Sequence, residues 1–172
     1  MMLQSRYLNE VDLKDFGFKS IGKNVKISSD ARIYGPENIS IGNDVRIDDF
    51  TILSAINGSI TLGNYVFIAR KSHLSGYHGI EMHDFSGMGA NTIIYSASDD
   101  YSGDYLTAQS IPQKYTAHIG GPVIIAKHVI IGSTCTIIGP SVIGEGCSLG
   151  AMTFVHRNLK SWGVYFGIPA KR

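Results

Sequence analysis

The sequence predicts an all-β solenoid in which short strands stack as triangular coils, and two registers of residues support this fold class. The first register consists of large apolar residues in six triplets whose members lie six positions apart. The triplets are Ile21, Ile27, Ile33; Ile41, Ile47, Leu53; Leu62, Ile68, Leu74; Met82, Met88, Ile94; Ile125, Ile131, Ile137; and Ile143, Leu149, Val155. Repetition at a fixed period indicates a repeat architecture.

The second register places a small side chain two residues before the later members of each triplet. These residues are Val25, Ala31, Val45, Thr51, Val66, Ser72, Ser86, Thr92, Val129, Cys135, Cys147 and Thr153. A period of six fits a strand of about four residues plus a corner of about two, and stacked coils lie about 4.8 Å apart. We therefore predict about six coils, with the large residue filling the prism and the small residue fitting where the wall bends.

The coils follow one another along residues 21–155 of a single domain. Turn-forming clusters at 35–38 and 57–59 supply the extra residues of the longer coils. The step from Met82 to Ile125 is too long for one coil, so we expect an excursion loop at about 98–121.

The two ends are expected to differ from the coils. Residues 1–20 are predicted to form an N-terminal cap, with a short helix that contains Leu8, Val11, Leu13 and Phe16 and stops at Gly17. A solenoid needs its open ends covered, which is the role expected of this segment. Residues 156–172 leave the six-residue register and are predicted to be a C-terminal tail.

Composition restricts the classes of function. The net charge of +1 and the absence of a basic stripe argue against a nucleic-acid partner. The sequence shows neither a signal-type apolar segment near its start nor eighteen consecutive apolar residues, so we expect no membrane insertion and a cytoplasmic location. Cys135 and Cys147 fall on the small-residue register and are expected to be buried thiols.

Several motifs resemble the hexapeptide-repeat acyltransferases. They are the hexads, the corners Ile41-Gly42, Leu62-Gly63, Ile131-Gly132 and Ile143-Gly144, the pair Gly150-Ala151, and the closing Gly167-Ile168-Pro169-Ala170-Lys171. The resemblance implies a left-handed parallel β-helix, a homotrimer with active sites between subunits, and acetyl-CoA as acyl donor without a metal. Residues 98–103 and 121–123 look most like sugar acetyltransferases of surface-polysaccharide (lipopolysaccharide) pathways.

Acetyl transfer needs a base that accepts a proton from the attacking amine or hydroxyl, and histidine suits neutral pH. The stretch from His78 to Phe85 resembles the window around the catalytic histidine of nucleotide-amino-sugar N-acetyltransferases. We therefore predict His78 as the catalytic residue, with Glu81 or Asp84 orienting its imidazole. The alternative is a solvated histidine at a corner of the prism.

The acceptor is expected to contact the excursion. We expect Asp84, Asn91, Asp99, Asp100 and Tyr101 to bind it. In the galactoside and maltose O-acetyltransferases the catalytic histidine lies where this chain has the pair Asp99-Asp100. Whether His78 or this carboxylate pair takes the base role stays open, as does the interpretation of the pair as an Asp-rich turn.

The acyl donor is expected along the later coils. The resemblance implies that its pantetheine arm follows Gly132, Ser133, Gly150 and Ala151, where small residues permit close approach to the backbone. Its phosphates need cations, for which Arg157, Lys160 and Lys171 are candidates. For each of these cations a solvated surface residue is the alternative.

The resulting hypothesis is an acetyl-CoA-dependent acetyltransferase that acts on the amine of a nucleotide-linked amino sugar. An O-acetyltransferase acting on a glycan hydroxyl is the first alternative. A zinc protein similar to γ-class carbonic anhydrases, with His73 and His78 as ligands, is a second, although no histidine precedes His73 to complete the site. A β-helix without catalytic activity is the third.

Overall fold

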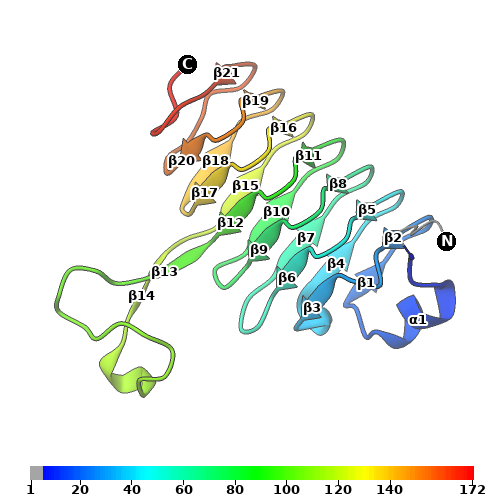
Figure 1. Cartoon of the computed structure of the whole chain (residues 1–172), viewed down its shortest axis with the longest axis horizontal. Coiled ribbons are helices and arrows are strands. Elements are labelled where there is room, and N and C mark those ends of the chain that lie inside the picture. The colour runs from blue at the N-terminus through cyan, green and yellow to red at the C-terminus, as the bar shows by residue number, and fades with distance from the viewer. Residues whose placement is uncertain (1–5) are drawn as a thin grey trace, which may run out of the picture.

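The computed structural model describes residues 6–172 and shows three parallel sheets that form the walls of a triangular prism (Figure 1). Sheet 1 contains β1 (Ser20–Ile21), β4 (Ile39–Ile41), β7 (Ile60–Leu62), β10 (Ile80–Met82), β15 (Val123–Ile125) and β18 (Ser141–Ile143). Sheet 2 contains β2 (Lys26–Ile27), β5 (Arg46–Ile47), β8 (Phe67–Ile68), β11 (Gly87–Met88), β16 (Ile130–Ile131), β19 (Ser148–Leu149) and β21 (Val164–Tyr165). Sheet 3 contains β3 (Arg32–Tyr34), β6 (Ile52–Ser54), β9 (His73–Ser75), β12 (Ile93–Tyr95), β17 (Thr136–Ile138) and β20 (Phe154–Val155).

The pairing register of the strands reproduces the triplets of the sequence. Ile21 pairs with Ile41 in sheet 1, Ile27 with Ile47 in sheet 2, and Ile33 with Leu53 in sheet 3, and the later triplets continue these rows. The triplet residues from Ile41 onward are at most 4% exposed, so they form one continuous core along the prism axis. The predicted left-handed β-helix with a short N-terminal helix and one excursion is confirmed.

The corners show why small residues are needed between strands. Apart from the half-buried Val25, the small-residue register is buried. Its threonine hydroxyls bond to backbone carbonyls at the corner between sheets 2 and 3, as in the 3.1 Å bond from Thr92 Oγ1 to the Gly132 oxygen, and the Ser86 hydroxyl bonds to the His83 oxygen at the corner between sheets 1 and 2. Cys135 and Cys147 are free and buried, as expected, and burial raises the pKa of the Cys135 thiol. Their thiols donate to the carbonyl oxygens of Gly150 and Lys160.

The N-terminal helix α1 (Glu10–Asp15) lies beside the first coils (Figure 1). Asn9 caps it, because its side chain accepts from the backbone N–H groups of Val11 and Asp12 while the Asp12 carboxylate accepts from the Asn9 N–H. Leu13 is the buried residue of the helix and contacts the core cluster. Residues 1–5 of the predicted cap lie outside the described residues.

The C-terminal segment differs from the prediction of a tail that leaves the register. Leu159 pairs with Ile143, and β21 pairs with β19, so residues 156–172 begin a seventh coil. Tyr165 fills the apolar position six residues after Leu159, and Gly163 takes the small position beneath its ring. A Cβ on Gly163 would lie 2.4 Å from Tyr165 Cε2, which shows that the larger core residue is compensated by the smaller corner residue.

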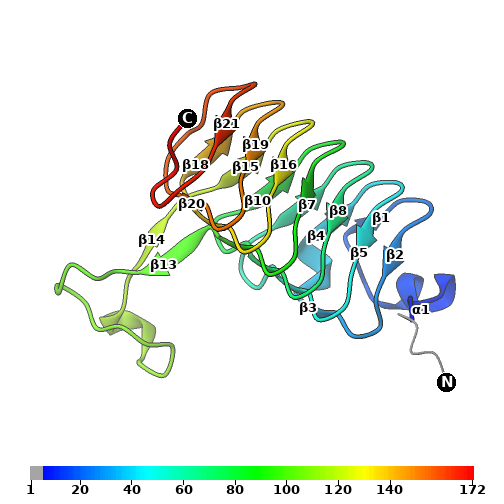
Figure 2. The same cartoon turned by 45° about the horizontal axis from the view of Figure 1, so that its top comes forward.

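The excursion leaves the prism between β12 and β15 as an antiparallel ribbon. It consists of β13 (Ala97–Asp99) and β14 (His118–Gly120), and the connection between them contains the 3₁₀ turn η2 (Gln113–Tyr115). Figures 1 and 2 show this arm projecting away from the stacked coils, whereas the other 3₁₀ turn, η1 (Pro36–Asn38), stays at the corner after β3. Within residues 6–172, no helix is both long and apolar enough to cross a membrane.

Candidate active site

A cavity of about 670 Å³ lies between the outer face of sheet 3 and the base of the excursion. Its floor is formed by the last residues of four neighbouring strands, and the excursion and two corners supply the remaining walls. The lining residues are Ser54, Ile56, Asn57, Ser75, Tyr77, Tyr95, Ala97, Ser98, Asp99, Tyr101, Ala108, Gln109, Ile111, Gln113, Thr116, His118 and Ile138. Hydroxyls, amides and aromatic rings dominate this list, which suits a polar ligand that carries a sugar or a base.

One edge of the cavity brings together two imidazoles, a phenol and a carboxylate. Nδ1 of His118 lies 3.3 Å from Oδ1 of Asp99, and the two side chains are 29% and 27% exposed. The ring of Tyr77 lies 5.2 Å from that of His118 and 5.0 Å from that of His78, measured between centroids. Tyr77 therefore contacts both histidines, and it lines the cavity together with His118.

Ser96 connects the corner that carries His78 to the base of the excursion. Its buried hydroxyl accepts from the backbone N–H of His78 at 2.9 Å and donates to the carbonyl oxygen of Ser75 at 3.0 Å. Its carbonyl oxygen accepts from the N–H of Gly121, which follows β14. Both segments are thus positioned by one residue at the end of β12.

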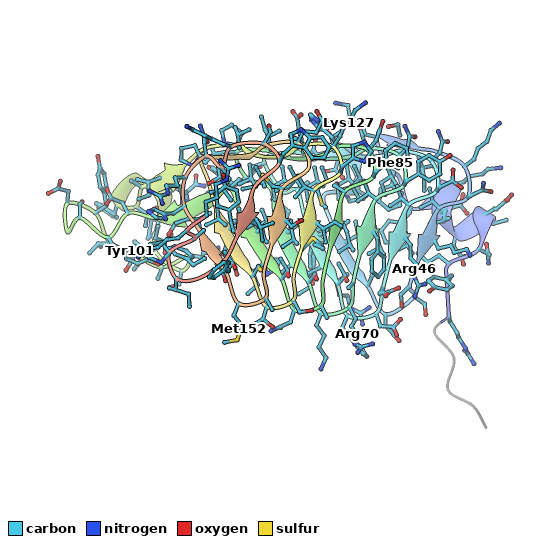
Figure 3. The ribbon with its side chains drawn as sticks, turned by 90° about the horizontal axis from the view of Figure 1, so that it is seen from above. Arg46, Arg70, Phe85, Tyr101, Lys127 and Met152 are labelled. Carbon is cyan, nitrogen blue, oxygen red and sulfur yellow. The ribbon has the colours of Figure 1, made fainter. Side chains whose placement is uncertain are left out.

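The predicted acceptor residues divide into two groups. Asp99 and Tyr101 line the cavity, and Asp100 lies between them in a turn, with its carboxylate accepting from the Ser102 N–H at 2.7 Å. Asp84 and Asn91 lie on the two other edges of the prism. Figure 3 shows that these regions are apart, because Phe85, next to Asp84, lies along the side of the stacked coils near Lys127, whereas Tyr101 lies at the end where the excursion projects.

Within one chain, Glu81 and Asp84 contact residues other than His78, so the prediction that one of them orients His78 is wrong. Asp84 accepts from the backbone N–H of Asn64 at 2.8 Å, which is the main reason why its pKa is lowered, and it faces Lys127 at 3.7 Å. Glu81 contacts His83 instead, at 3.2 Å. The cause is the solenoid geometry: residues that follow His78 pass along sheet 1 to the next corner. The catalytic role of His78 itself stays a prediction.

The residues predicted for the donor lie at the corner between sheets 2 and 3, where the close contacts are explained first by coil stacking. A Cβ on Gly132 would lie 2.6 Å from the backbone nitrogen of Ala151, so glycine is needed there to let consecutive coils approach. The backbone N–H groups of Ser133 and Ala151 donate to no other described residue. These two donors suit the carbonyl oxygens of a pantetheine arm, and the corner therefore fits such a ligand.

The three predicted phosphate-binding cations do not form a cluster. Lys160 follows Leu159 at the corner between sheets 1 and 2, whereas Arg157 lies at the corner after β20 and donates to the Ala170 carbonyl oxygen at 3.2 Å. Lys171 pairs through its backbone with Phe166. Their role toward phosphates stays a prediction.

The zinc alternative lacks a ligand set in the part of the chain that the structure describes. No three His, Cys, Asp or Glu side chains are grouped there so that they could hold a metal ion. His73 contacts the Tyr95 hydroxyl at 3.5 Å, and burial lowers its pKa.

Sequence reasoning did not single out Tyr77 and His118 as site residues. The available signal for His118 was its position near the end of the predicted excursion, since a loop that leaves and re-enters a β-helix brings its ends together. Tyr77 lies one coil earlier, at the corner after β9.

Comparison with known proteins relates this architecture to sugar acyltransferases. The chain is 42% identical over 165 residues to a dTDP-4-amino-4,6-dideoxy-D-glucose acyltransferase of Escherichia coli. The aligned region covers 96% of this chain and 86% of the relative. A lipopolysaccharide biosynthesis O-acetyl transferase of the same species, described as putative, is 23% identical to this chain. The aligned region covers 92% of this chain and 72% of that relative. No protein-family model matches the chain.

Solved structures give the same relationship. One is a variant of AntD, an N-acyltransferase from Bacillus cereus, in complex with dTDP-4-amino-4,6-dideoxyglucose and coenzyme A. It superposes on this chain with a TM-score of 0.92 at 46% sequence identity. The superposition covers 98% of this chain and 89% of that one. A hexapeptide-repeat acetyltransferase of Vibrio cholerae shares the fold at a TM-score of 0.67 and 18% identity, covering 95% and 76%. The length and identity of the first match show that this chain belongs to the hexapeptide-repeat sugar acyltransferases and is an acyl-CoA-dependent enzyme.

Proposed function

We propose that the protein transfers an acyl group from acyl-CoA, with acetyl-CoA as the first candidate, to the amine of a dTDP-linked amino sugar. The observation that carries this proposal is the cavity beside the excursion, whose wall combines a carboxylate, hydroxyls and tyrosine rings. The polar groups of this wall suit the hydroxyls and the amine of a sugar, and the tyrosines suit stacking on a sugar or a thymine ring. The AntD complex with dTDP-4-amino-4,6-dideoxyglucose supports the same acceptor class.

We further propose that the enzyme works as a homotrimer in the cytoplasm, within a pathway that builds surface polysaccharide. The donor corner, which is the corner between sheets 2 and 3 that carries Gly132 and Ala151, lies on a different edge of the chain from the acceptor cavity. A neighbouring subunit that presents its donor corner to this cavity would bring the thioester to the amine. Light scattering of the purified protein tests the trimer, and a monomer that keeps full activity would contradict it.

The function is tested by measuring thiol release from acetyl-CoA with a panel of acceptors. The panel contains dTDP-4-amino-4,6-dideoxyglucose, the matched dTDP-glucose without an amine, a UDP-linked amino sugar and neutral glycosides. We expect turnover with the dTDP-linked amine and none with dTDP-glucose, because attack requires the amine. Turnover with dTDP-glucose or glycosides alone would establish the O-acyl alternative, and no turnover with any acceptor would refute the proposal.

A further inference from the structure

The excursion places a histidine and a carboxylate opposite each other on one face of its ribbon. Asp99 and His118 are directly paired residues of the antiparallel strands β13 and β14. Directly opposed residues of such a pair have Cβ atoms about 5 Å apart on the same face, which is close enough for their side chains to interact. Their contact of 3.3 Å is therefore fixed by strand register and does not depend on the path of the connecting loop.

The geometry points to His118, oriented by Asp99, as the general base of the acyl transfer. Nδ1 of His118 lies within ion-pair distance of the carboxylate. In the proposed mechanism the neutral imidazole carries its proton on Nδ1, toward Asp99, which leaves Nε2 as the acceptor. Both side chains line the cavity, so the imidazole borders the space assigned to the sugar. Asp99 is a positioning residue for the imidazole and also stabilises the imidazolium that forms.

His78 offers a weaker arrangement for the same role. Its ring contacts Tyr77, but its side chain has no carboxylate within ion-pair distance among residues 6–172. Tyr77 lies between the two imidazoles and packs against both of them. The groups in contact with the His118 ring are thus Asp99 from β13 and the phenol of Tyr77 from the corner after β9, and the same phenol also contacts His78.

The chemical step balances with these groups alone and rests on the proposed function. The neutral amine of the acceptor attacks the thioester carbonyl carbon, which forms the C–N bond, and Nε2 of His118 takes the proton that the nitrogen loses. Collapse of the tetrahedral intermediate breaks the C–S bond. The leaving thiolate receives the proton from the imidazolium, which regenerates the neutral imidazole and gives free CoA thiol.

Four variants of the full-length protein test this inference in the thiol-release assay. They are His118→Asn, Asp99→Asn, His78→Asn and His83→Asn, the last being a matched control at an exposed histidine of another edge. Loss of a general base lowers turnover by about 10²-fold or more. We expect this loss in kcat for His118→Asn with KM changed less than about 3-fold, smaller losses for Asp99→Asn and His78→Asn than for His118→Asn, and near-wild-type kcat for the control His83→Asn.

Imidazole ¹⁵N spectra of the histidine-labelled enzyme report the positioning role without relying on turnover. We expect His118 to carry its proton on Nδ1 in the wild type and to lose this preference in Asp99→Asn, while thermal unfolding stays unchanged. Full activity of His118→Asn in an enzyme whose wild type is active would overturn the inference and leave the proposed function standing. A large loss in His78→Asn alone would return the base role to His78, and no wild-type turnover would refute both proposals.

Discussion

Replacement of Gly132 by alanine tests whether the corner glycines are required by coil stacking. A Cβ at this position would lie 2.6 Å from the nitrogen of Ala151, 2.8 Å from the oxygen of Leu149 and 2.9 Å from the carbonyl carbon of Gly150. Favourable contacts between heavy atoms lie at about 3.5–4.0 Å, so each of these distances is too short by several tenths of an ångström. All three atoms belong to the backbone of the next coil and cannot move away as a flexible side chain can.

The cost follows from how firmly the two coils are joined. The Gly132 N–H donates to the Leu149 oxygen at 2.8 Å, and the Met152 N–H donates to the Ser133 oxygen at 2.9 Å, so relief of the clash must lengthen these bonds. Overpacking of this kind costs about 1–3 kcal/mol or more. For a domain of this length, each kcal/mol lowers the unfolding midpoint by about 2–4 °C. We therefore expect Gly132→Ala to melt roughly 2–12 °C below the wild type in differential scanning calorimetry.

Gly87→Ala is the matched control, because the same chemical change is made on the outer face of β11. There a Cβ would lie 3.7 Å from the Phe67 oxygen and 3.8 Å from the Phe67 Cβ, which are ordinary contacts. This variant should melt within about 2 °C of the wild type or slightly above it, since alanine lowers the entropy of the unfolded chain. An unfolding midpoint of Gly132→Ala equal to that of Gly87→Ala would refute the stacking argument and leave donor binding as the reason for glycine.

The remaining predictions concern two titrating side chains of the solenoid. Asp84→Ala should destabilise the fold by about 1–2 kcal/mol through loss of the acceptor for the Asn64 N–H, whereas Asp84→Asn keeps an acceptor and should cost less. Because this hydrogen bond lowers the pKa of Asp84, its carboxylate stabilises the fold above the ordinary pKa near 4, and this contribution is lost as the pH falls through the lowered value. Urea unfolding curves of wild type and Asp84→Asn should therefore converge at acid pH, and a constant gap would contradict the assignment. Burial lowers the pKa of His73, so the unfolded chain binds the proton more readily and the wild type loses stability as the pH falls below about 6.5. His73→Gln should lack this slope between pH 7 and 5; equal slopes would show that His73 is not its source.

The solenoid could be predicted from the sequence because its physics is local and repeated. Each core residue is set by a spacing of six, and parallel stacking aligns equivalent positions of consecutive coils, as the Ile27–Ile47 pair shows. The seventh coil was missed because Tyr165 and Gly163 replace the usual aliphatic and small residues. The six-residue step from Leu159 to Tyr165 was nevertheless present in the sequence.

The candidate site was harder to predict because neighbours in sequence do not stay together at a prism corner. Asp84 follows His78 closely along the chain, yet the strand β10 between them carries it to another edge. Sequence proximity was therefore a poor guide to which carboxylate meets which imidazole. Asp99 was identified because acidic residues at the start of an excursion resemble a known pattern, whereas its partner depends on where the chain returns.

The return point is set by the ribbon at the base of the excursion. Gly120 pairs with Ala97 and approaches Ser96 so closely that a Cβ on it would lie 2.3 Å from the Ser96 oxygen. Its φ of +140° is also unfavourable for other residues. Glycine at this position thus fixes the register that opposes His118 to Asp99. Because the register is fixed at the base, the connecting loop can change its sequence without displacing the pair. In the proposed mechanism, the ribbon therefore holds the proton-transfer geometry independently of the loop beyond it.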